Sequence, residues 1–310
     1  MADTMATREA YGKTLVKMGA EKKDLVVMDA DLSGSTKTGD FKKVYPERFF
    51  NVGIAEQNLY AMAAGIALSG KTVCASTFAM FAAGRAFEII RNSIGYTKAN
   101  VKVCATHAGI TVGEDGASHQ TFEDLALMRT IPGMVVVNPC DGVSAEILLE
   151  QVINMQGPAY VRLGRAKVPM FYEEGAKLEI GKANLLKDGK DMTIIATGIM
   201  VNEAMIAAAE LEKEGKSVRV IDMHTIKPLD KDIIIKAAKE TGKILTAEEH
   251  SIIGGLGSAV CEVVAENAPC KVVRVGQLDT YGESGKPEEL KAKYKMNADA
   301  ILAKAREELL

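Results

Sequence analysis

Short apolar segments alternate with amphipathic, helix-like segments along most of this chain of 310 residues. Such alternation is typical of βαβ units built around parallel sheets. We expect strands at 25–28, 71–75, 101–105, 134–137 and 159–163, and again at 192–196, 217–221, 243–247 and 271–275. Helices are expected at 56–69, 142–155, 202–214, 230–241 and 298–310. Glycines close several of these helical segments, as expected for helix ends.

The alternation stops between residues 164 and 190, where Pro169, Gly175, Gly181 and Gly189 fall among scattered charges. Such a stretch is typical of a connection between domains. The sequence therefore predicts an α/β fold of two domains. A larger parallel-sheet domain is expected at 1–165, a linker at 166–190, and a smaller α/β domain at 191–310.

The composition is that of an ordinary globular protein, with 47% hydrophobic and 25% charged residues. A net charge of −3 without a basic tract gives no electrostatic support for nucleic acid as a partner. No apolar run approaches the roughly 18 residues that span a bilayer, and the first residues lack a signal-peptide pattern, so we expect a cytoplasmic protein without membrane contact. The five cysteines form no C-x-x-C pair, which favours reduced thiols over disulfides or zinc ligands.

The segment 106–120, Thr-His-Ala-Gly-Ile-Thr-Val-Gly-Glu-Asp-Gly-Ala-Ser-His-Gln, is the strongest candidate site. It holds His107, Asp115 and His119, and so two of the four histidines, on a loop rich in glycine. His107 directly follows a predicted strand, at the edge where open α/β sheets bind ligands. The spacing does not suit a metal site, and a hydrogen-bonding or proton-transfer role fits better. A structural role for both histidines remains the alternative.

Glu56 opens an alanine-rich helix that is almost wholly apolar and should be buried. One interpretation is a carboxylate stabilised by the helix dipole. The other is a desolvated acid that needs a partner, which a nitrogen donor of a ligand would supply. Phe78 and Phe81 follow another predicted strand; they form either part of the core or a flat wall for a planar heterocycle.

The turn at 254–258, Gly-Gly-Leu-Gly-Ser, precedes a helix and could hold a phosphate at the helix N-terminus. It fails the G-x-G-x-x-G pattern because Val260 stands where the last glycine belongs, so a tight strand-to-helix turn is favoured. His224 and His250 are isolated and are interpreted as structural.

Three motifs in order resemble the pyrimidine-binding domain of transketolase. They are Gly-Ile-Ala-Glu-Gln at 53–57, Ser-Thr-Phe-x-x-Phe at 76–81, and the run with Gly-Glu-Asp-Gly-x-x-His-Gln within 106–120. Shorter matches lie at 6–8, 30–35 and 165–169. The part beyond the linker resembles the family's carboxyl-terminal domain, including Ala-Glu-Glu-His at 247–250, so the resemblance covers essentially the whole chain.

The resemblance implies a transferase that uses thiamine diphosphate, in which Glu56 hydrogen-bonds the aminopyrimidine ring and so helps the cofactor to lose its reactive proton. Phe78 and Phe81 would flank that ring, and Asp31 would lie near the cofactor. The implied reaction moves a two-carbon ketol unit from a ketose phosphate to an aldose phosphate through a thiamine diphosphate carbanion, as in the pentose phosphate pathway.

The resemblance also implies substrate contacts. Arg8, Ser35, His107 and Arg165 match the family's sugar-phosphate ligands; taken singly, these arginines and Arg162 are unremarkable. Asp115 matches a contact to a substrate hydroxyl, and His119 matches a contact near the reacting carbon. Arginine suits phosphate because its planar fork donates two hydrogen bonds.

Two departures qualify the resemblance. The chain has no Gly-Asp-Gly, the family's motif for holding the diphosphate and its Mg²⁺ (or Ca²⁺). It therefore resembles the carboxyl-terminal subunit of a split transketolase, inactive alone and dependent on an amino-terminal subunit that carries the metal, in a dimer of this chain or a heterotetramer. Gly84-Arg85 stands where many transketolases carry another aromatic residue.

Alternative interpretations remain open. 1-Deoxyxylulose-5-phosphate synthase shares Gly-Ile-Ala-Glu-Gln and an Asp-Gly-x-x-His-Gln segment, and the beta subunit of a 2-oxo-acid dehydrogenase shares the two-domain plan. A non-catalytic regulatory or assembly subunit is a third possibility. The Gly-Glu-Asp-Gly run favours transketolase over the first two, and the joint presence of Glu56, His107, Asp115 and His119 argues against the third.

Overall fold

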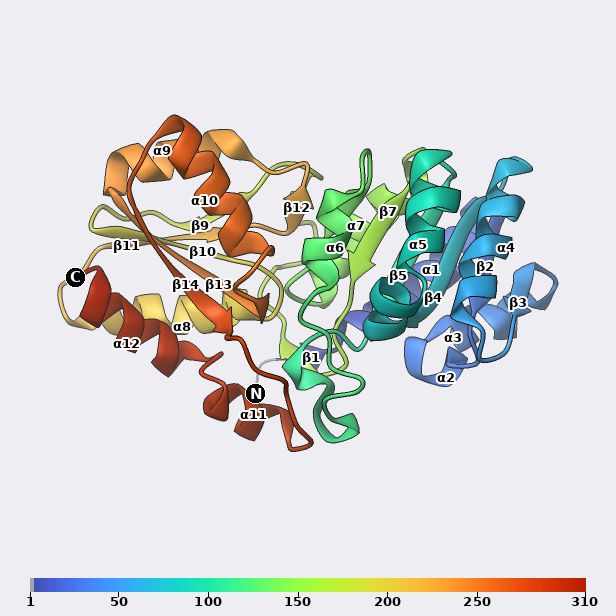
Figure 1. Ribbon diagram of the computed structural model, residues 1–310, viewed down its shortest axis with the longest axis horizontal. Coiled ribbons are helices and arrows are strands. Elements are labelled where there is room, and N and C mark those ends of the chain that lie inside the picture. Colours follow the sequence, from blue (N-terminus) through green and yellow to red (C-terminus); the bar gives the residue numbers. More distant parts are fainter. Residues whose placement is uncertain (1–2) are drawn as a thin grey trace.

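Two sheets lie side by side in the computed structural model, which describes residues 3–310 (Figure 1). The first sheet has seven strands in the order β12-β6-β7-β5-β4-β2-β3. All neighbours in it are parallel except β12, which runs antiparallel to β6. Its strands are β2 (Leu25–Asp29), β3 (Phe49–Asn51), β4 (Thr72–Phe78), β5 (Val101–Thr106), β6 (Val135–Val137), β7 (Ala159–Arg162) and β12 (Thr225–Lys227).

Helices cover both faces of this sheet because its central strands are apolar on both sides. Leu25 and Val27 pack among α1 (Thr7–Glu21), α3 (Thr38–Val44) and α7 (Gly142–Asn154), whereas Val26 and Met28 pack on the other face. That second face is covered by α4 (Glu56–Leu68), α5 (Phe87–Ile89) and α6 (Asp124–Thr130). π-Helical turns at Phe81–Arg85 and Ile90–Tyr96 flank α5, α2 (Ser33–Thr36) follows β2, and 3₁₀ turns occupy Pro46–Arg48 and Ile110–Asp115.

The second sheet has five strands in the order β14-β13-β10-β11-β9, of which only the edge strand β9 is antiparallel to its neighbour. Its strands are β9 (Asn184–Lys187), β10 (Met192–Ala196), β11 (Val218–Asp222), β13 (Lys243–Ser251) and β14 (Lys271–Gln277). α8 (Met200–Lys213) and α12 (Ala298–Glu308) cover one face, and α9 (Lys231–Thr241) and α10 (Leu256–Asn267) the other. α11 (Pro287–Lys293) follows β14 and lies beside the turn Ile110–Asp115. The prediction of two α/β domains is confirmed.

The two domains interlock more closely than the sequence pattern indicates. β12 belongs by sequence to the second half but extends the first sheet, and one apolar cluster contains Met134 and Tyr160 together with Ile221 and Leu256. A small ribbon also joins β1 (Thr4–Met5) to β8 (Val168–Pro169). Within the expected connection lies β9, whose Leu185-Leu186 run is too short to stand out as a strand from sequence.

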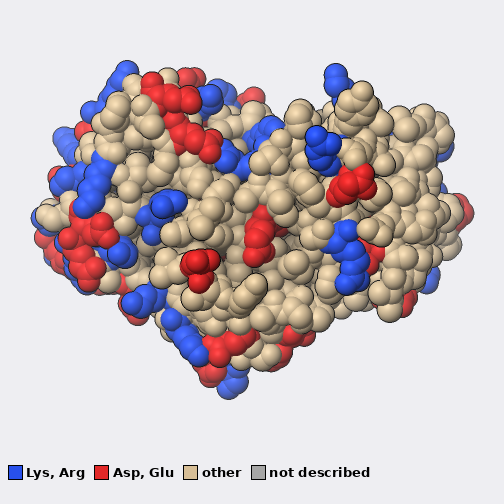
Figure 2. Space-filling model, viewed as in Figure 1, with Lys and Arg blue, Asp and Glu red and all other residues tan. Residues whose placement is uncertain are grey.

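Charges of both signs are interspersed over the face seen in Figure 2, in keeping with the nearly neutral net charge of −3. The part of the first domain at the right of that view, where α4 and α5 lie, is mostly uncharged. Across residues 3–310, every helix is too short or too polar to cross a lipid bilayer.

One buried carboxylate fastens the segment after β8 to the first domain. Asp141 is the N-cap of α7, where its Oδ1 accepts a hydrogen bond from the Ser144 amide at 2.7 Å. Its other oxygen, Oδ2, accepts the amide N–H groups of Phe171 and Tyr172, both at 2.7 Å. A single side chain thus caps a core helix and holds the chain where it leaves the first domain.

We expect Asp141→Ala to lower the free energy of unfolding by about 2–3 kcal/mol, because it removes a helix cap and leaves further amide groups without an acceptor. Urea denaturation at fixed protein concentration measures this. Asp40→Ala is the matched control, since Asp40 pairs with Lys43 near the surface and its loss should cost less than about 1 kcal/mol. Equal effects of the two substitutions would contradict the assignment.

Candidate functional site

Five adjacent strands of the first sheet deliver the candidate residues to one edge. β3, β2, β4, β5 and β7 are neighbours and parallel, so their carboxyl ends share that edge. Glu56, Asp31, Phe78, His107 and Arg165 lie at or just beyond those five ends. The sheet therefore brings together residues that are far apart in sequence, at the edge where such sheets bind ligands.

Glu56 is a buried acid with one loose partner. It is the first residue of α4 and only 3% exposed. Its Oε2 lies 3.4 Å from Nη1 of Arg85, a side chain that is itself 58% exposed and also lies over the Phe81 ring. A buried carboxylate is costly unless it is paired. A nitrogen donor from a ligand would stabilise it, as the sequence suggested.

Two phenylalanines and two histidines form an aromatic cluster next to this acid. The rings of Phe78 and Phe81 stack with centroids 6.0 Å apart and planes at 16°. His107 stacks on Phe78 at 3.8 Å, and His119 meets Phe81 edge-on at 5.3 Å. Phe81 begins a π-helical turn, a feature found frequently at functional sites. The cluster offers a flat apolar surface for a planar ring.

His107 is held in a strained and electropositive setting. Its backbone is left-handed, with φ of 58°, and its Nδ1 lies 2.9 Å from Oγ1 of Thr106. Burial, together with the positive charges of Arg8 and Arg165, lowers the pKa of His107 to about 3. The ring is therefore neutral at physiological pH, and it can donate or accept a hydrogen bond without carrying charge.

Arg8 and Arg165 place two guanidinium groups near His107. Arg8 lies in the first turn of α1; its Nη1 donates to the Ser35 carbonyl at 2.7 Å, and its buried Nε has no partner among the described residues. Burial lowers the pKa of Arg8. Arg165 Nη1 donates to the Val112 carbonyl and to Glu114 Oε2 at 2.5 and 2.6 Å. Paired guanidinium groups with an unused donor suit a phosphate.

Asp31 and Asp115 are the more exposed candidates. Asp31 has a left-handed φ of 64°, and Oδ1 of Asn51 accepts the amides of both Asp31 and Gly53, which ties the Asp31 turn to the segment before Glu56. Asp115 is exposed at the end of the 3₁₀ turn. Within residues 3–310, no hydrogen bond joins Asp115 to another candidate residue.

Two other expectations are resolved by geometry. Arg162 is buried and bound to protein groups: its Nε donates to Asp124 at 2.8 Å and its Nη2 to the Glu249 carbonyl at 2.8 Å, so it is not an open anion ligand. The turn at 254–258 is a tight turn in which the carboxylate of Glu248 accepts the Leu256 and Gly257 amides. The side chain of Glu248 thus occupies the N-terminus of α10.

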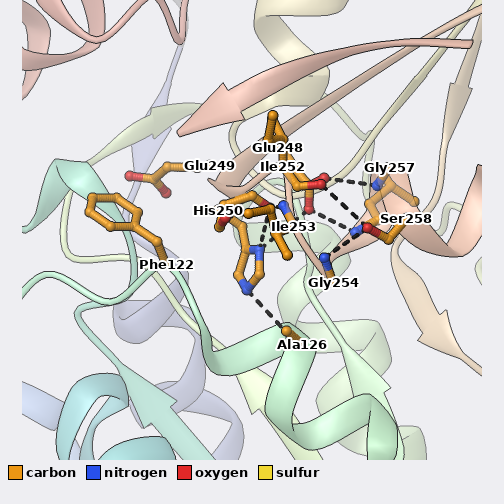
Figure 3. A network of polar contacts seen from close by, with 12 residues as sticks. Phe122, Ala126, Glu248, Glu249, His250, Ile252, Ile253, Gly254, Gly257 and Ser258 are labelled. Atoms are coloured by element: carbon orange, nitrogen blue, oxygen red, sulfur yellow. Dashed lines mark hydrogen bonds and ion pairs between the residues drawn. The ribbon is translucent and has the colours of Figure 1, made fainter. Parts of the chain in front are cut away.

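The network at the end of β13 is what sequence reasoning missed (Figure 3). His250 is not isolated: its Nε2 accepts the Ala126 amide at 3.4 Å, and its Nδ1 donates to the Ser251 carbonyl at 2.8 Å. These partners fit a neutral ring, and burial lowers the pKa of His250. The available signal was three consecutive ionisable residues, 248–250, directly after the predicted strand 243–247.

Comparison with known proteins follows the same division of the chain. Residues 3–170 match the transketolase pyrimidine binding domain, and residues 181–301 match the transketolase C-terminal domain. The chain belongs to the transketolase family. It is 52% identical over 305 residues to a Methanocaldococcus jannaschii protein described as "Putative transketolase C-terminal section", with 97% of this chain and 96% of that protein covered.

Other transketolase relatives show how much of the enzyme this chain represents. It is 40% identical over 309 residues to one subunit of the apulose-4-phosphate transketolase of Phocaeicola vulgatus, with 99% of each chain covered. Against rat (Rattus norvegicus) transketolase it is 39% identical but spans 49% of that protein, with 97% of this chain covered. A solved structure described as a split gene transketolase, inactive beta4 tetramer, is similar with a TM-score of 0.92 at 53% identity and 98% coverage of both chains.

We expect the His107 ring to stay neutral from pH 8 down to pH 5. In a histidine-labelled sample the four histidines give few ring resonances, and His107→Gln assigns the relevant one by NMR. A titration midpoint near 6.5, the value of a free imidazole, would contradict this. The unfolded chain protonates this histidine below about pH 6.5, whereas the folded chain does so only near pH 3. The free energy of unfolding should therefore decrease as the pH is lowered through that window, and it should decrease less in His107→Gln.

Proposed function

We propose that this chain is the carboxyl-terminal subunit of a transketolase that moves a two-carbon ketol unit from a ketose phosphate to an aldose phosphate. It acts with thiamine diphosphate and with a separate amino-terminal subunit that holds the diphosphate and Mg²⁺ or Ca²⁺. The observation that carries the proposal is the buried carboxylate of Glu56 beside the aromatic cluster, at the sheet edge that also bears Arg8, His107 and Arg165.

The residues present fit the pyrimidine part of the cofactor. Glu56 is buried and loosely paired, so it can exchange Arg85 for a ring nitrogen donor, and Phe78 and Phe81 offer a wall for the ring. Asp31 lies on the neighbouring turn. When bound, thiamine diphosphate would supply the nucleophilic carbon that carries the two-carbon unit.

The charges and positions of several side chains support the proposed contacts to the sugar phosphate. Arg8 and Arg165, together with the Ser35 turn, would bind the sugar phosphate, and neutral His107 would hydrogen-bond the substrate without repelling the guanidinium groups. His119 extends from the loop 106–120 and meets the Phe81 ring edge-on, where it would act near the reacting carbon. The exposed carboxylate of Asp115 is assigned to a substrate hydroxyl.

A partner chain is supported by exposed apolar side chains in the segment before Glu56. Phe50 and Ile54 are exposed there, and Ile54 reaches 79% exposure; Met62 and Leu68 are exposed further along α4. Exposed apolar patches mark surfaces that another chain covers. No group of three or more His, Cys, Asp or Glu side chains that could hold a metal occurs within 3–310. We propose a dimer of this chain within a heterotetramer.

Two-carbon transfer from xylulose 5-phosphate to ribose 5-phosphate, with thiamine diphosphate and Mg²⁺, tests the proposal directly. We expect activity only when this chain is mixed with the amino-terminal subunit. Apulose 4-phosphate belongs in the donor panel because a relative of similar length bears that substrate in its name. Activity of this chain alone would overturn the need for a partner, and no transfer with any donor would overturn the proposed reaction.

Glu56→Ala should lower the transfer rate of the mixture by at least about 100-fold, because it removes a group that acts on a proton-transfer step. Glu56→Gln, which keeps the shape but not the acid, should fall similarly. Glu88→Gln on the neighbouring α5 is the control, since Glu88 is exposed and pairs with Asn92. Full activity of Glu56→Ala in an assembled complex would exclude the assigned role.

A further inference from the structure

Two neighbouring carboxylates at the end of β13 serve opposite sides of the strand. Glu248 points toward α10 and Glu249 points away from it, toward Phe122 of the first domain (Figure 3). This follows from the alternation of side chains along a strand. Glu248 accepts the Leu256 and Gly257 amides at 2.7 and 2.8 Å and so stabilises its own domain. Glu249 instead acts across the domain interface.

Glu249 is built into the loop that carries His107. Its Oε1 accepts the Thr111 amide at 2.7 Å. The backbone of Gly109 lies directly on the carboxylate, so that a Cβ there would collide with Cδ of Glu249, and its φ of 80° also favours glycine. The segment 109–111 therefore wraps around one side chain of the other domain.

Arg162 compensates the charge of this buried carboxylate. Its Nη1 lies 3.7 Å from Oε2 of Glu249, its Nη2 donates to the Glu249 carbonyl, and its Nε donates to Asp124. Tyr160 donates its hydroxyl to the same Asp124 oxygen at 2.7 Å. Arg162 itself is 4% exposed. A buried anion that is paired and hydrogen-bonded in this way is held in one place.

The loop after β5, which contacts Glu249, begins with His107, the residue of the candidate site with a left-handed backbone. The Ala108 amide donates to the Leu163 carbonyl at 3.3 Å, and the Gly109 amide donates to the Thr121 carbonyl at 3.2 Å. With Thr111 fixed by Glu249, the backbone that follows His107 is bound at successive residues. A left-handed residue such as His107 persists only where its surroundings enforce it.

A second ion pair joins the two domains at a distance in sequence from Glu249. Arg129 on α6 and Glu262 on α10 form another ion pair across the same interface, with both guanidinium Nη atoms hydrogen-bonded to the carboxylate. That pair makes no hydrogen bond to the loop 107–120 within the described residues. It offers a matched comparison for what an interdomain ion pair does away from the site.

We propose that Glu249 is a positioning residue through which the carboxyl-terminal domain fixes the backbone of residues 107–111 and thereby the ring of His107. The inference rests on the proposed function for what His107 does, but its structural part does not depend on turnover. It assigns a role in the active site to a domain that contributes none of the candidate site residues.

Hydrogen exchange of the assembled complex tests the structural part. Glu249→Ala should speed exchange of the amides in 107–116 at least about tenfold, because Thr111 loses its acceptor. It should also shift the His107 ring resonances. Glu249→Gln keeps an oxygen acceptor for Thr111 and should restore most of the protection.

Glu262→Ala is the control and should leave exchange in 107–116 unchanged. Urea unfolding and complex assembly are measured for all variants, so that a general loss of structure is recognised. The proposal is overturned if Glu249→Ala leaves this segment protected, if exchange rises equally throughout the chain, or if Glu262→Ala has the same local effect.

Kinetics test the functional part in the same complexes. A displaced His107 should raise KM for the ketose phosphate about tenfold or more in Glu249→Ala, with recovery in Glu249→Gln. An unchanged KM alongside loosened exchange would overturn the link to substrate. If the native complex transfers no two-carbon unit, the proposed function fails, while the exchange result still decides whether Glu249 positions the loop.

Discussion

The contact between the two domains depends on the buried guanidinium group of Arg162. It lies between Asp124 at the start of α6 and Glu249 at the end of β13, and neither carboxylate has access to bulk water. Two buried anions without a cation would be strongly destabilising. Because one planar cation binds both, α6, the loop after β5 and the second sheet are held in a single arrangement. Burial raises the pKa of Glu249, and the charge of Arg162 and the Thr111 hydrogen bond act in the opposite direction.

The parallel sheet determines how the candidate site residues are arranged. Its strand order sends β3, β2, β4, β5 and β7 to one edge, so acid, aromatic, imidazole and guanidinium groups gather there without being close in sequence. Their electrostatics are mutually dependent. Burial, together with the positive charges of Arg8 and Arg165, lowers the pKa of His107, and the neutral ring adds no further charge beside the two guanidinium groups.

Much of this could be predicted from sequence, for identifiable reasons. Buried parallel strands are continuous apolar runs, so most of the strands could be predicted, and His107 was predicted to lie at the sheet edge where ligands bind; Phe78 was predicted only to follow another strand. The pairing of β12 with β6 was not, because a three-residue strand has no pattern of its own. Nor could the sequence show that Arg162 is already paired: its partners lie 38 and 87 residues away, and an unpaired arginine looks the same.

The distribution of satisfied and unsatisfied groups gives a physical reason why one chain can fold while holding only part of a site. On the side of the carboxyl-terminal domain, the loop is bound by Glu249, which accepts the Thr111 amide. On the side of α4, Arg85 is the only ion-pair partner of Glu56 among residues 3–310, and apolar residues such as Ile54 are exposed. Arg85 limits the cost of the buried acid, yet more than half of its side chain is exposed, so a ligand can displace it without disturbing the core. The side of the site that faces the carboxyl-terminal domain is therefore fixed by this chain, and under the proposed function another chain would complete the side of α4.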